Sequence, residues 1–167
     1  MNQTERQMKP TIKKLGETKL VGNNVRMSFA NNKTVVLWQN FMQRRKEIIN
    51  SIGTELYSIE LYNDPAFFRN FSSIKEFEKW AAIKVSDFDF IPENMNKLTI
   101  PSGEYAVFHY KGKPSEAQPT YQFIYGQWIP NSEYRLDDRP HFALMGENYK
   151  GEHPDSEEEF WIPIKKK

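Results

Sequence analysis

The sequence has no cysteine, no long apolar run and almost no excess of charge, and each absence excludes a class of protein. Without cysteine, the 167-residue chain has no disulfide framework, no thiolate zinc site and no thiol nucleophile. No apolar stretch approaches the ~20 residues of a membrane-spanning helix, and residues 1–14 lack the apolar segment of a secretory signal. A net charge of +1 argues against a protein dedicated to nucleic acid. We therefore expect a cytoplasmic protein that binds neither DNA directly nor membranes.

Motifs for common cofactors and catalytic groups are absent as well. The sequence contains no P-loop, no dinucleotide-binding glycine motif and no nucleophile elbow. The three histidines, His109, His141 and His153, have no histidine or glutamate at a metal-binding spacing. We therefore expect neither a metal nor a cofactor.

Aromatic residues are abundant, at 14% of the chain. Because each large ring buries roughly 150–250 Å², these rings are enough to build the core of one domain. They also exceed what packing alone obviously requires, which favours a pocket lined with aromatic side chains.

Hydrophobic periodicity divides the chain into two series of elements. Residues 19–29 predict a strand, and an i, i+3, i+4, i+7 stripe predicts a helix over residues 34–52. The first series ends with strands at 56–62 and 77–85, separated by a loop at 63–73. After a connector at 87–96 the order repeats, with a strand at 98–110, a helix that begins near Pro119 and stops before Pro130, and strands at 142–145 and 160–164.

The two series overlay on each other. Trp80–Lys84 and Trp161–Lys165 share a W-x-x-I-K pattern 81 residues apart, and the same offset superimposes the helices. This predicts an α+β fold of duplicated β-α-β-β modules related by a pseudo-twofold axis, with helices on an antiparallel sheet and a central ligand cleft. We expect a flexible tail over residues 1–13 and one domain over residues 14–167, built from half-repeats at about 14–90 and 96–167.

Several side chains are candidates for this cleft. Aromatic residues on the predicted helices and strands are compatible with either core or pocket at this stage. Glu159 lies on the same side of its predicted strand as Trp161, so it is a candidate carboxylate of the cleft.

Four segments of the second half stand in a recognisable order. They are Tyr105–Phe108, Tyr121–Ser132, Pro140–Phe142 and Glu159–Ile164, and Trp38 and Phe77–Ala82 extend the pattern into the first half. In this order the sequence resembles the GyrI-like (gyrase-inhibitor-like) family, an effector-binding domain also found at the C-terminus of AraC-type transcription regulators. The resemblance runs from about residue 14 to the C-terminus.

The resemblance implies two β-α-β-β modules and a cleft that binds hydrophobic, often cationic or aromatic, small molecules. One departure stands out. Relatives typically place a glutamate after the Pro-His-Phe segment, thought to pair with cationic ligands and to act in the hydrolytic members, and this sequence has Ala143. Two explanations are open: natural divergence, or an introduced Glu→Ala substitution that disables the site.

We therefore expect a stand-alone small-molecule-binding domain of the multidrug-binding type, a monomer or weak dimer. The expected ligand-binding residues are Trp38, Tyr62, Trp80, Tyr125, Trp128, Ala143, Met145, Glu159 and Trp161. One alternative is a hydrolase of cyclopropane-bearing or similar genotoxins, impaired or inactive because of Ala143. A second is an interaction protein with a macromolecular partner, such as a gyrase modulator.

Overall fold

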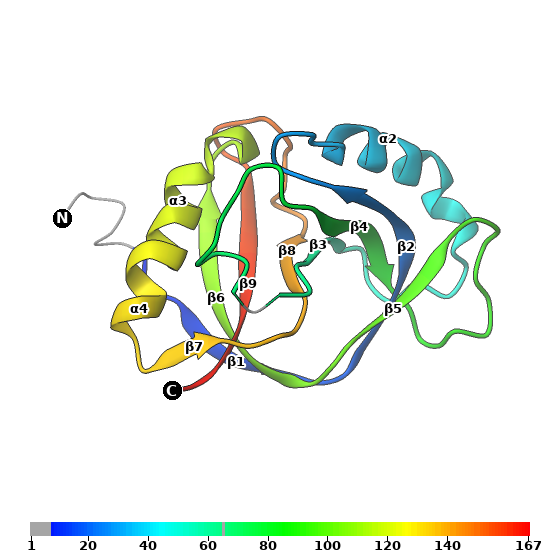
Figure 1. Ribbon diagram of the computed structural model, residues 1–167. Helices are drawn as coiled ribbons and strands as arrows, with labels where there is room; N and C mark the ends of the chain where they lie inside the picture. Colours follow the sequence, from blue (N-terminus) through cyan, green and yellow to red (C-terminus); the bar gives the residue numbers. More distant parts are fainter. Residues whose placement is uncertain (1–7, 65) are drawn as a thin grey trace.

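The computed structural model describes residues 8–64 and 66–167, and Figure 1 shows its elements in sequence colours. The strands are β1 (Thr11–Leu15), β2 (Thr18–Met27), β3 (Leu56–Leu61), β4 (Phe77–Lys84), β5 (Asn96–Ile100), β6 (Gly103–Lys111), β7 (Tyr134–Leu136), β8 (His141–Met145) and β9 (Glu157–Lys166). The helices are α2 (Thr34–Arg44), α3 (Gln118–Phe123) and α4 (Ile129–Asn131), with shorter turns η1 (Arg45–Glu47), η2 (Pro114–Glu116) and the π-helical η3 (Ile124–Trp128).

The strands form one nine-stranded antiparallel sheet with an internal symmetry. Its order is β1-β6-β9-β8-β3-β4-β2-β5, with β7 paired to β9. β3 and β8 lie at the centre, where Ser58 is the partner of Ala143. Outward from this seam, β4, β2 and β5 on one side correspond to β9, β6 and β1 on the other. The predicted α+β class and the predicted duplication are both confirmed.

The helices cover one face of the sheet, one in each half. Leu37 and Phe41 of α2 pack with Val21 of β2 and Ala81 of β4. In the other half, Ile124 belongs to a second cluster with residues of β6 and β9. A third cluster, which includes Trp80 and Trp161, is formed by side chains that point from the opposite face of the strands.

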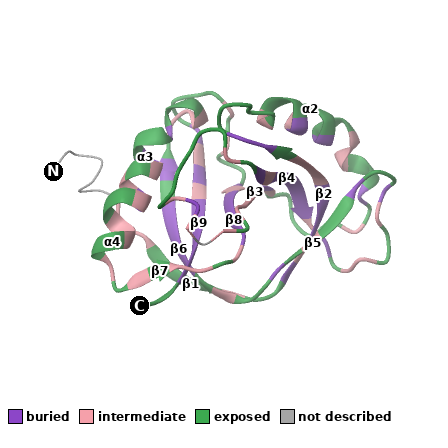
Figure 2. Ribbon diagram, viewed as in Figure 1, coloured by how far each residue is buried: buried purple, intermediate pink, exposed green. Residues whose placement is uncertain are grey.

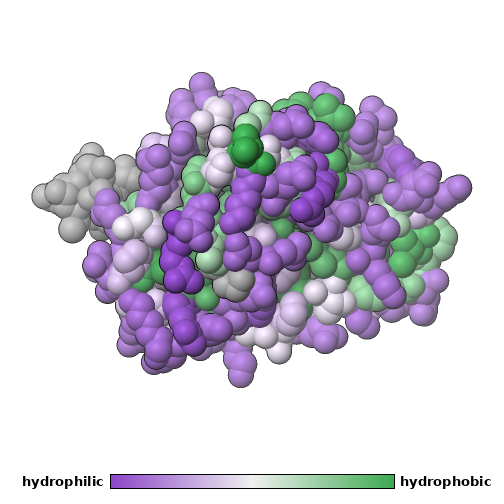
Figure 3. All heavy atoms as spheres, viewed as in Figure 1, coloured by the Kyte–Doolittle hydropathy of each residue, from purple (hydrophilic) through white to green (hydrophobic). Residues whose placement is uncertain are grey.

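Burial follows this arrangement. In Figure 2 the buried segments are mostly strand, whereas the outer sides of the helices are exposed. The surface in Figure 3 is mainly hydrophilic, with hydrophobic atoms gathered toward the side of α2 and β5. Among the described residues, none of the helices has the length and apolar character needed to cross a bilayer.

Four sequence predictions need correction. One is the expected helix stop before Pro130, because α4 continues that helical segment through Pro130 to Asn131. The helix predicted over residues 34–52 ends at Arg44 and the turn η1, because Ile48 adopts an extended backbone and the Ile52 N–H donates to the Lys84 carbonyl (2.8 Å). The strand predicted over residues 98–110 is two strands, because β5 pairs with β2 while β6 pairs with β1 and β9.

The last correction concerns the N-terminal tail. Residues 11–13 belong to β1, which pairs with β6, so part of the expected tail lies in the sheet. Polar side chains fit this strand because β1 is mostly exposed at the end of the strand order. Residues 1–7 of the expected tail lie outside the described residues.

We expect Gly22→Ala to lower the free energy of unfolding by about 1–3 kcal/mol or more, through overpacking. Gly22 lies on β2 opposite Ala82, and an added methyl group would collide with the Ala81 carbonyl oxygen and with Ala82. Urea unfolding measures the effect. Gly16→Ala is the matched control, because a methyl group there has nothing within 4 Å, and an equal loss in both variants would refute the steric argument.

Candidate functional site

A cavity of about 500 Å³ lies over the centre of the sheet, between α2 and the start of α3. Its floor is hollow because small side chains stand in register across the seam: Ala81 pairs with Ser58, and Ser58 with Ala143. Phe160 of β9, the next partner of Ala143, closes the row. The cavity therefore sits where the two half-modules meet.

The walls of the cavity are mostly apolar. Trp38 and Met42 come from α2, Ala117 and Tyr121 from the second helical segment, and Met145 from β8. The remaining lining residues are Thr34, Leu56, Ser58, Glu60, Lys79, Pro114, Ala143, Tyr149, Glu158 and Phe160. Its volume and lining are typical of sites for small organic molecules.

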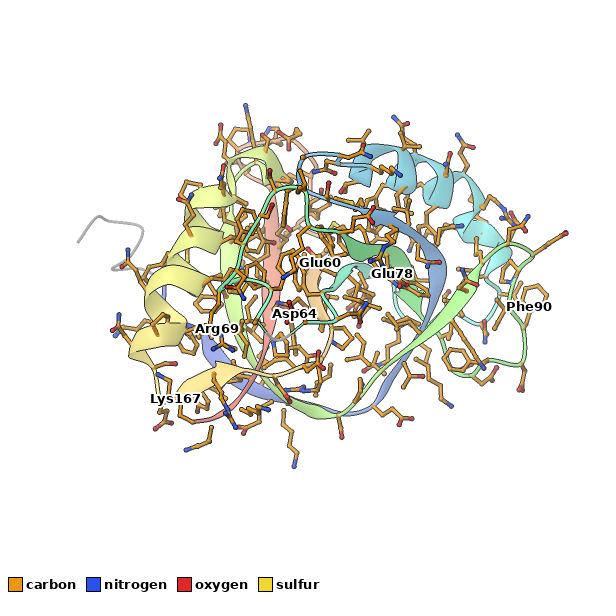
Figure 4. All side chains as sticks on the ribbon, viewed as in Figure 1. Glu60, Asp64, Arg69, Glu78, Phe90 and Lys167 are labelled. Atoms are coloured by element: carbon orange, nitrogen blue, oxygen red, sulfur yellow. The ribbon has the colours of Figure 1, made fainter. Side chains whose placement is uncertain are left out.

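A buried ion pair lies at one side of the cavity. Glu60 of β3 and Lys79 of β4 are direct cross-strand partners, and the Lys79 Nζ lies 3.2 Å from the Glu60 Oε1. Their side chains are only 17% and 9% exposed. Burial raises the pKa of the Glu60 carboxyl, and the neighbouring Lys79 ammonium opposes that rise. Figure 4 shows Glu60 in the middle of the fold, near β8 and β4.

A second carboxylate, Glu158, lines the cavity from β9. Glu158 is 8% exposed, and burial raises the pKa of its carboxyl to about 7. Lys79 lowers this pKa and Glu60 raises it. Within the described part of the chain, the Oε2 atoms of both Glu60 and Glu158 are buried without a hydrogen-bond partner. The cavity thus holds two carboxyl groups and one ammonium group.

An aromatic cluster adjoins the Glu60 side of the cavity. His141 is the cross-strand partner of Glu60 at the seam. Its imidazole shares a hydrogen bond of 2.9 Å with the Tyr125 hydroxyl. Burial, together with the charge of Arg139, lowers the pKa of His141 to about 3, so the imidazole is neutral at physiological pH. Phe68, from the segment that crosses beside α3 in Figure 1, stacks on Tyr125 with ring centroids 4.0 Å apart.

The structure separates the residues expected from the sequence into three groups. Trp38, Ala143 and Met145 line the cavity. Tyr62 and Tyr125 belong to the adjoining aromatic cluster, where both contact the His141 ring.

The third group lies elsewhere. Trp128 packs edge-on against Phe108, and Trp80 and Trp161 lie in the core cluster of the opposite face. Glu159 is hydrogen-bonded by the Trp161 Nε1 (3.2 Å). Because successive side chains of a strand point to opposite faces, Glu158 faces the cavity and its neighbour Glu159 faces away, so Glu159 is not the carboxylate of this cavity.

The internal symmetry makes Glu60 the counterpart of Ala143. Trp80 is the cross-strand partner of Ile59, and Trp161 is the partner of Phe142. Superposing the two tryptophans therefore places Glu60 on Ala143, one residue further along each strand. The position that is alanine in the second half is glutamate in the first half.

Sequence reasoning missed Glu60, Lys79 and Glu158. The available signal was a charged residue at an inward position of a strand whose neighbours are apolar, as Lys79 is between Phe77 and Ala81. No group of three or more acidic or histidine side chains suited to a metal ion occurs among residues 8–64 and 66–167.

Comparison with known proteins identifies the family. The model of the GyrI-like small molecule binding domain matches residues 8–165. The transcriptional regulator BrlR of Pseudomonas aeruginosa is 25% identical over 130 residues, which are 77% of this chain and 45% of the regulator. The chain thus spans less than half of the regulator's length.

Several solved structures share the fold, among them SAV2435 and a hydrolase of Listeria innocua. SAV2435 bound to tetraphenylphosphonium superposes with a TM-score of 0.72 at 16% identity, over 93% of each chain. A hydrolase encoded by lin2189 of Listeria innocua superposes with a TM-score of 0.60 at 12% identity, over 94% of this chain and 92% of the hydrolase. At these identities the likeness establishes the fold.

We expect the free energy of unfolding of the wild type to fall, relative to that of Glu158→Gln, as the pH rises through about 7. His141, whose lowered pKa acts in the opposite direction between pH 5 and pH 8, contributes equally to both proteins. A carboxyl whose pKa is raised in the folded state stabilises that state fully below its ordinary pKa near 4.5 and loses the contribution as pH rises through about 7. The loss is on the order of 2 to 3 kcal/mol. Urea unfolding of both proteins at about pH 5 and about pH 8 measures it, and an identical pH dependence of stability in both would contradict the assignment to Glu158.

Proposed function

The chain belongs to the family of GyrI-like small-molecule-binding domains, and from this premise we propose that it binds apolar organic cations in the cavity between α2 and α3. One observation carries the proposal: a mostly apolar cavity of about 500 Å³ contains two carboxyl groups and a single ammonium. Burying an uncompensated charge is costly, so a ligand that supplies positive charge here stabilises the site while it binds.

The walls suit such a ligand. Trp38, Tyr121 and Phe160 present aromatic surface, and an aromatic face attracts a cation within about 6 Å by roughly 0.5–2 kcal/mol. Met42 and Met145 are unbranched and adapt to ligands of different shape. This lining favours ligands that carry positive charge and apolar surface, and it does not select one precise ligand shape.

Glu60 supports the proposal in another way. The family pattern places a glutamate at the position of Ala143, and Glu60 occupies the equivalent position in the first half. The chain thus keeps a carboxylate at the floor of the cavity, contributed from β3. The phosphonium held by SAV2435 belongs to the ligand class that this arrangement fits.

A second candidate function is hydrolysis of an apolar electrophile. The pKa of Glu158, at about 7, suits a group that exchanges protons at neutral pH, and the lin2189 hydrolase shares the fold. Product formed from a cyclopropane-bearing electrophile by the wild type but not by Glu158→Gln would favour this function. Product formation equal to the buffer blank would leave binding as the function.

The decisive experiment compares two ions of nearly equal shape and opposite charge. We expect tetraphenylphosphonium to bind and to change the tryptophan fluorescence, and tetraphenylborate not to bind. Glu60→Gln weakens the phosphonium by about 10-fold, or about 1.4 kcal/mol, because it removes the charge and keeps the shape. Glu159→Gln is the matched control on the opposite face, and its affinity stays at the wild-type value.

A steric variant locates the site independently of charge. Ala143→Leu adds side-chain volume to the floor of the cavity, so we expect it to weaken tetraphenylphosphonium by at least about 10-fold. Calorimetry measures the affinity, and a thermal melt shows whether the variant is folded. Equal binding of both ions to the wild type, or unchanged binding by a folded Ala143→Leu, would refute the proposed site.

A further inference from the structure

The cavity leaves two hydrogen-bond acceptors unused. Within the described part of the chain, the Glu60 Oε2 and the Glu158 Oε2 are buried and have no partner. Buried polar atoms in folded proteins almost always have a partner, and leaving a buried acceptor without one is costly, most of all when it is charged. Both oxygens belong to residues that line the same cavity.

Among the described residues that line the cavity, one cation faces these two carboxyl groups. It is Lys79, the single lysine or arginine of that described lining. Its ammonium is 3.2 Å from the other oxygen of Glu60, Oε1, and it forms no ion pair with Glu158 among those found in the described residues. Lys79 therefore compensates one carboxylate directly and leaves Glu158 without a paired cation.

The positions of the two carboxylates indicate where a cationic group of a ligand would lie. The floor of the cavity is the row of paired small residues Ala81, Ser58 and Ala143. Glu60 lies two residues beyond Ser58, on one side of this row. Continuing the register of β8 and β9 places Glu158 beside Met145, two residues beyond Ala143, on the other side. Ser58 and Ala143 lie between them and leave the floor open. Both carboxylates therefore face the cavity, from opposite sides of this floor.

We infer that the ligand is a protonated primary or secondary amine on an aromatic or aliphatic apolar body, with its N–H groups donated to the carboxylates of Glu60 and Glu158. This inference rests on the proposed function and makes it narrower. A phosphonium or a quaternary ammonium brings charge but no N–H donor, and so leaves both oxygens without partners. An ammonium brings the same charge and satisfies them, and hydrogen bonds to charged groups are shorter and stronger than those between neutral groups.

The same reasoning assigns a role to Lys79. Because its ammonium already holds the Glu60 Oε1, it positions that carboxylate with the free oxygen available to the ligand. It also keeps the net charge of the site small, so that a single positive charge on the ligand is enough. A doubly charged ligand would exceed what the two carboxyl groups and Lys79 require.

The test uses one apolar body with two head groups. The probes are 2-(1-naphthyl)ethylammonium and its N,N,N-trimethyl analogue, and calorimetry at low ionic strength gives both dissociation constants for the wild type. We expect the primary ammonium to bind at least about 10-fold more tightly, although methylation adds apolar surface that by itself favours the quaternary probe.

Variants assign the preference to the two carboxylates. In Glu158→Gln and in Glu60→Gln we expect the ratio of the two dissociation constants to fall toward one, because each variant removes a charged acceptor and keeps the side-chain shape. Glu159→Gln, whose side chain is on the opposite face, keeps the wild-type ratio. A thermal melt of each variant confirms that it is folded.

The outcomes separate this inference from the proposed function. If the quaternary probe binds as tightly as the primary probe or more tightly, the inference is overturned, and binding of apolar cations stands. A preference for the primary probe that survives both glutamine variants also overturns it. If neither probe nor tetraphenylphosphonium binds the wild type, the proposed function fails and the inference fails with it.

Discussion

The antiparallel pairing of β3 with β8 is the constraint on which the rest of the structure depends. It joins the two half-modules into one sheet and fixes which side chains of the central strands face the helices. Because Ser58 lies opposite Ala143 at this seam, the centre of that face is hollow. A shift of one residue in this register would turn the cavity residues toward the opposite face and close the hollow with larger side chains.

The two faces of the sheet carry different kinds of side chain. The face that carries Trp80 and Trp161 buries aromatic and aliphatic groups in one cluster and contributes hydrophobic stabilisation. The other face carries Glu60, Lys79 and Glu158, whose desolvation the ion pair offsets only in part. A buried charged group that adds little to stability is typical of a functional position. Hydrophobic clusters on both faces thus stabilise a fold in which this group of buried charged residues costs free energy.

The sequence predicts the fold well and part of the lining of the candidate cavity, for physical reasons. The repeated W-x-x-I-K pattern and the aligned order of elements reflect real symmetry, so the duplication was readable. The sequence does not show which face of the sheet each strand residue occupies. The central strands carry apolar residues on both faces, so their alternation does not say which face is covered by helices. For this reason the sequence pattern favours Glu159 over Glu158, although Glu158 is the one that lines the cavity. Trp38, Ala143 and Met145, which the sequence also favours, do line it. β1 was missed because its residues are polar, and only its pairing with β6 reveals it as a strand.

One strand of each half pairs with a strand of the other half. β1 of the first half pairs with β6 of the second, and β5 of the second half pairs with β2 of the first. This is the arrangement of a domain-swapped dimer within one polypeptide. Neither half completes its own sheet, so neither has the edge protection it needs to remain folded alone. The two halves therefore fold and unfold as one cooperative unit. A ligand bound at the seam between β3 and β8 accordingly stabilises the entire domain, so its binding energy appears in the global unfolding transition.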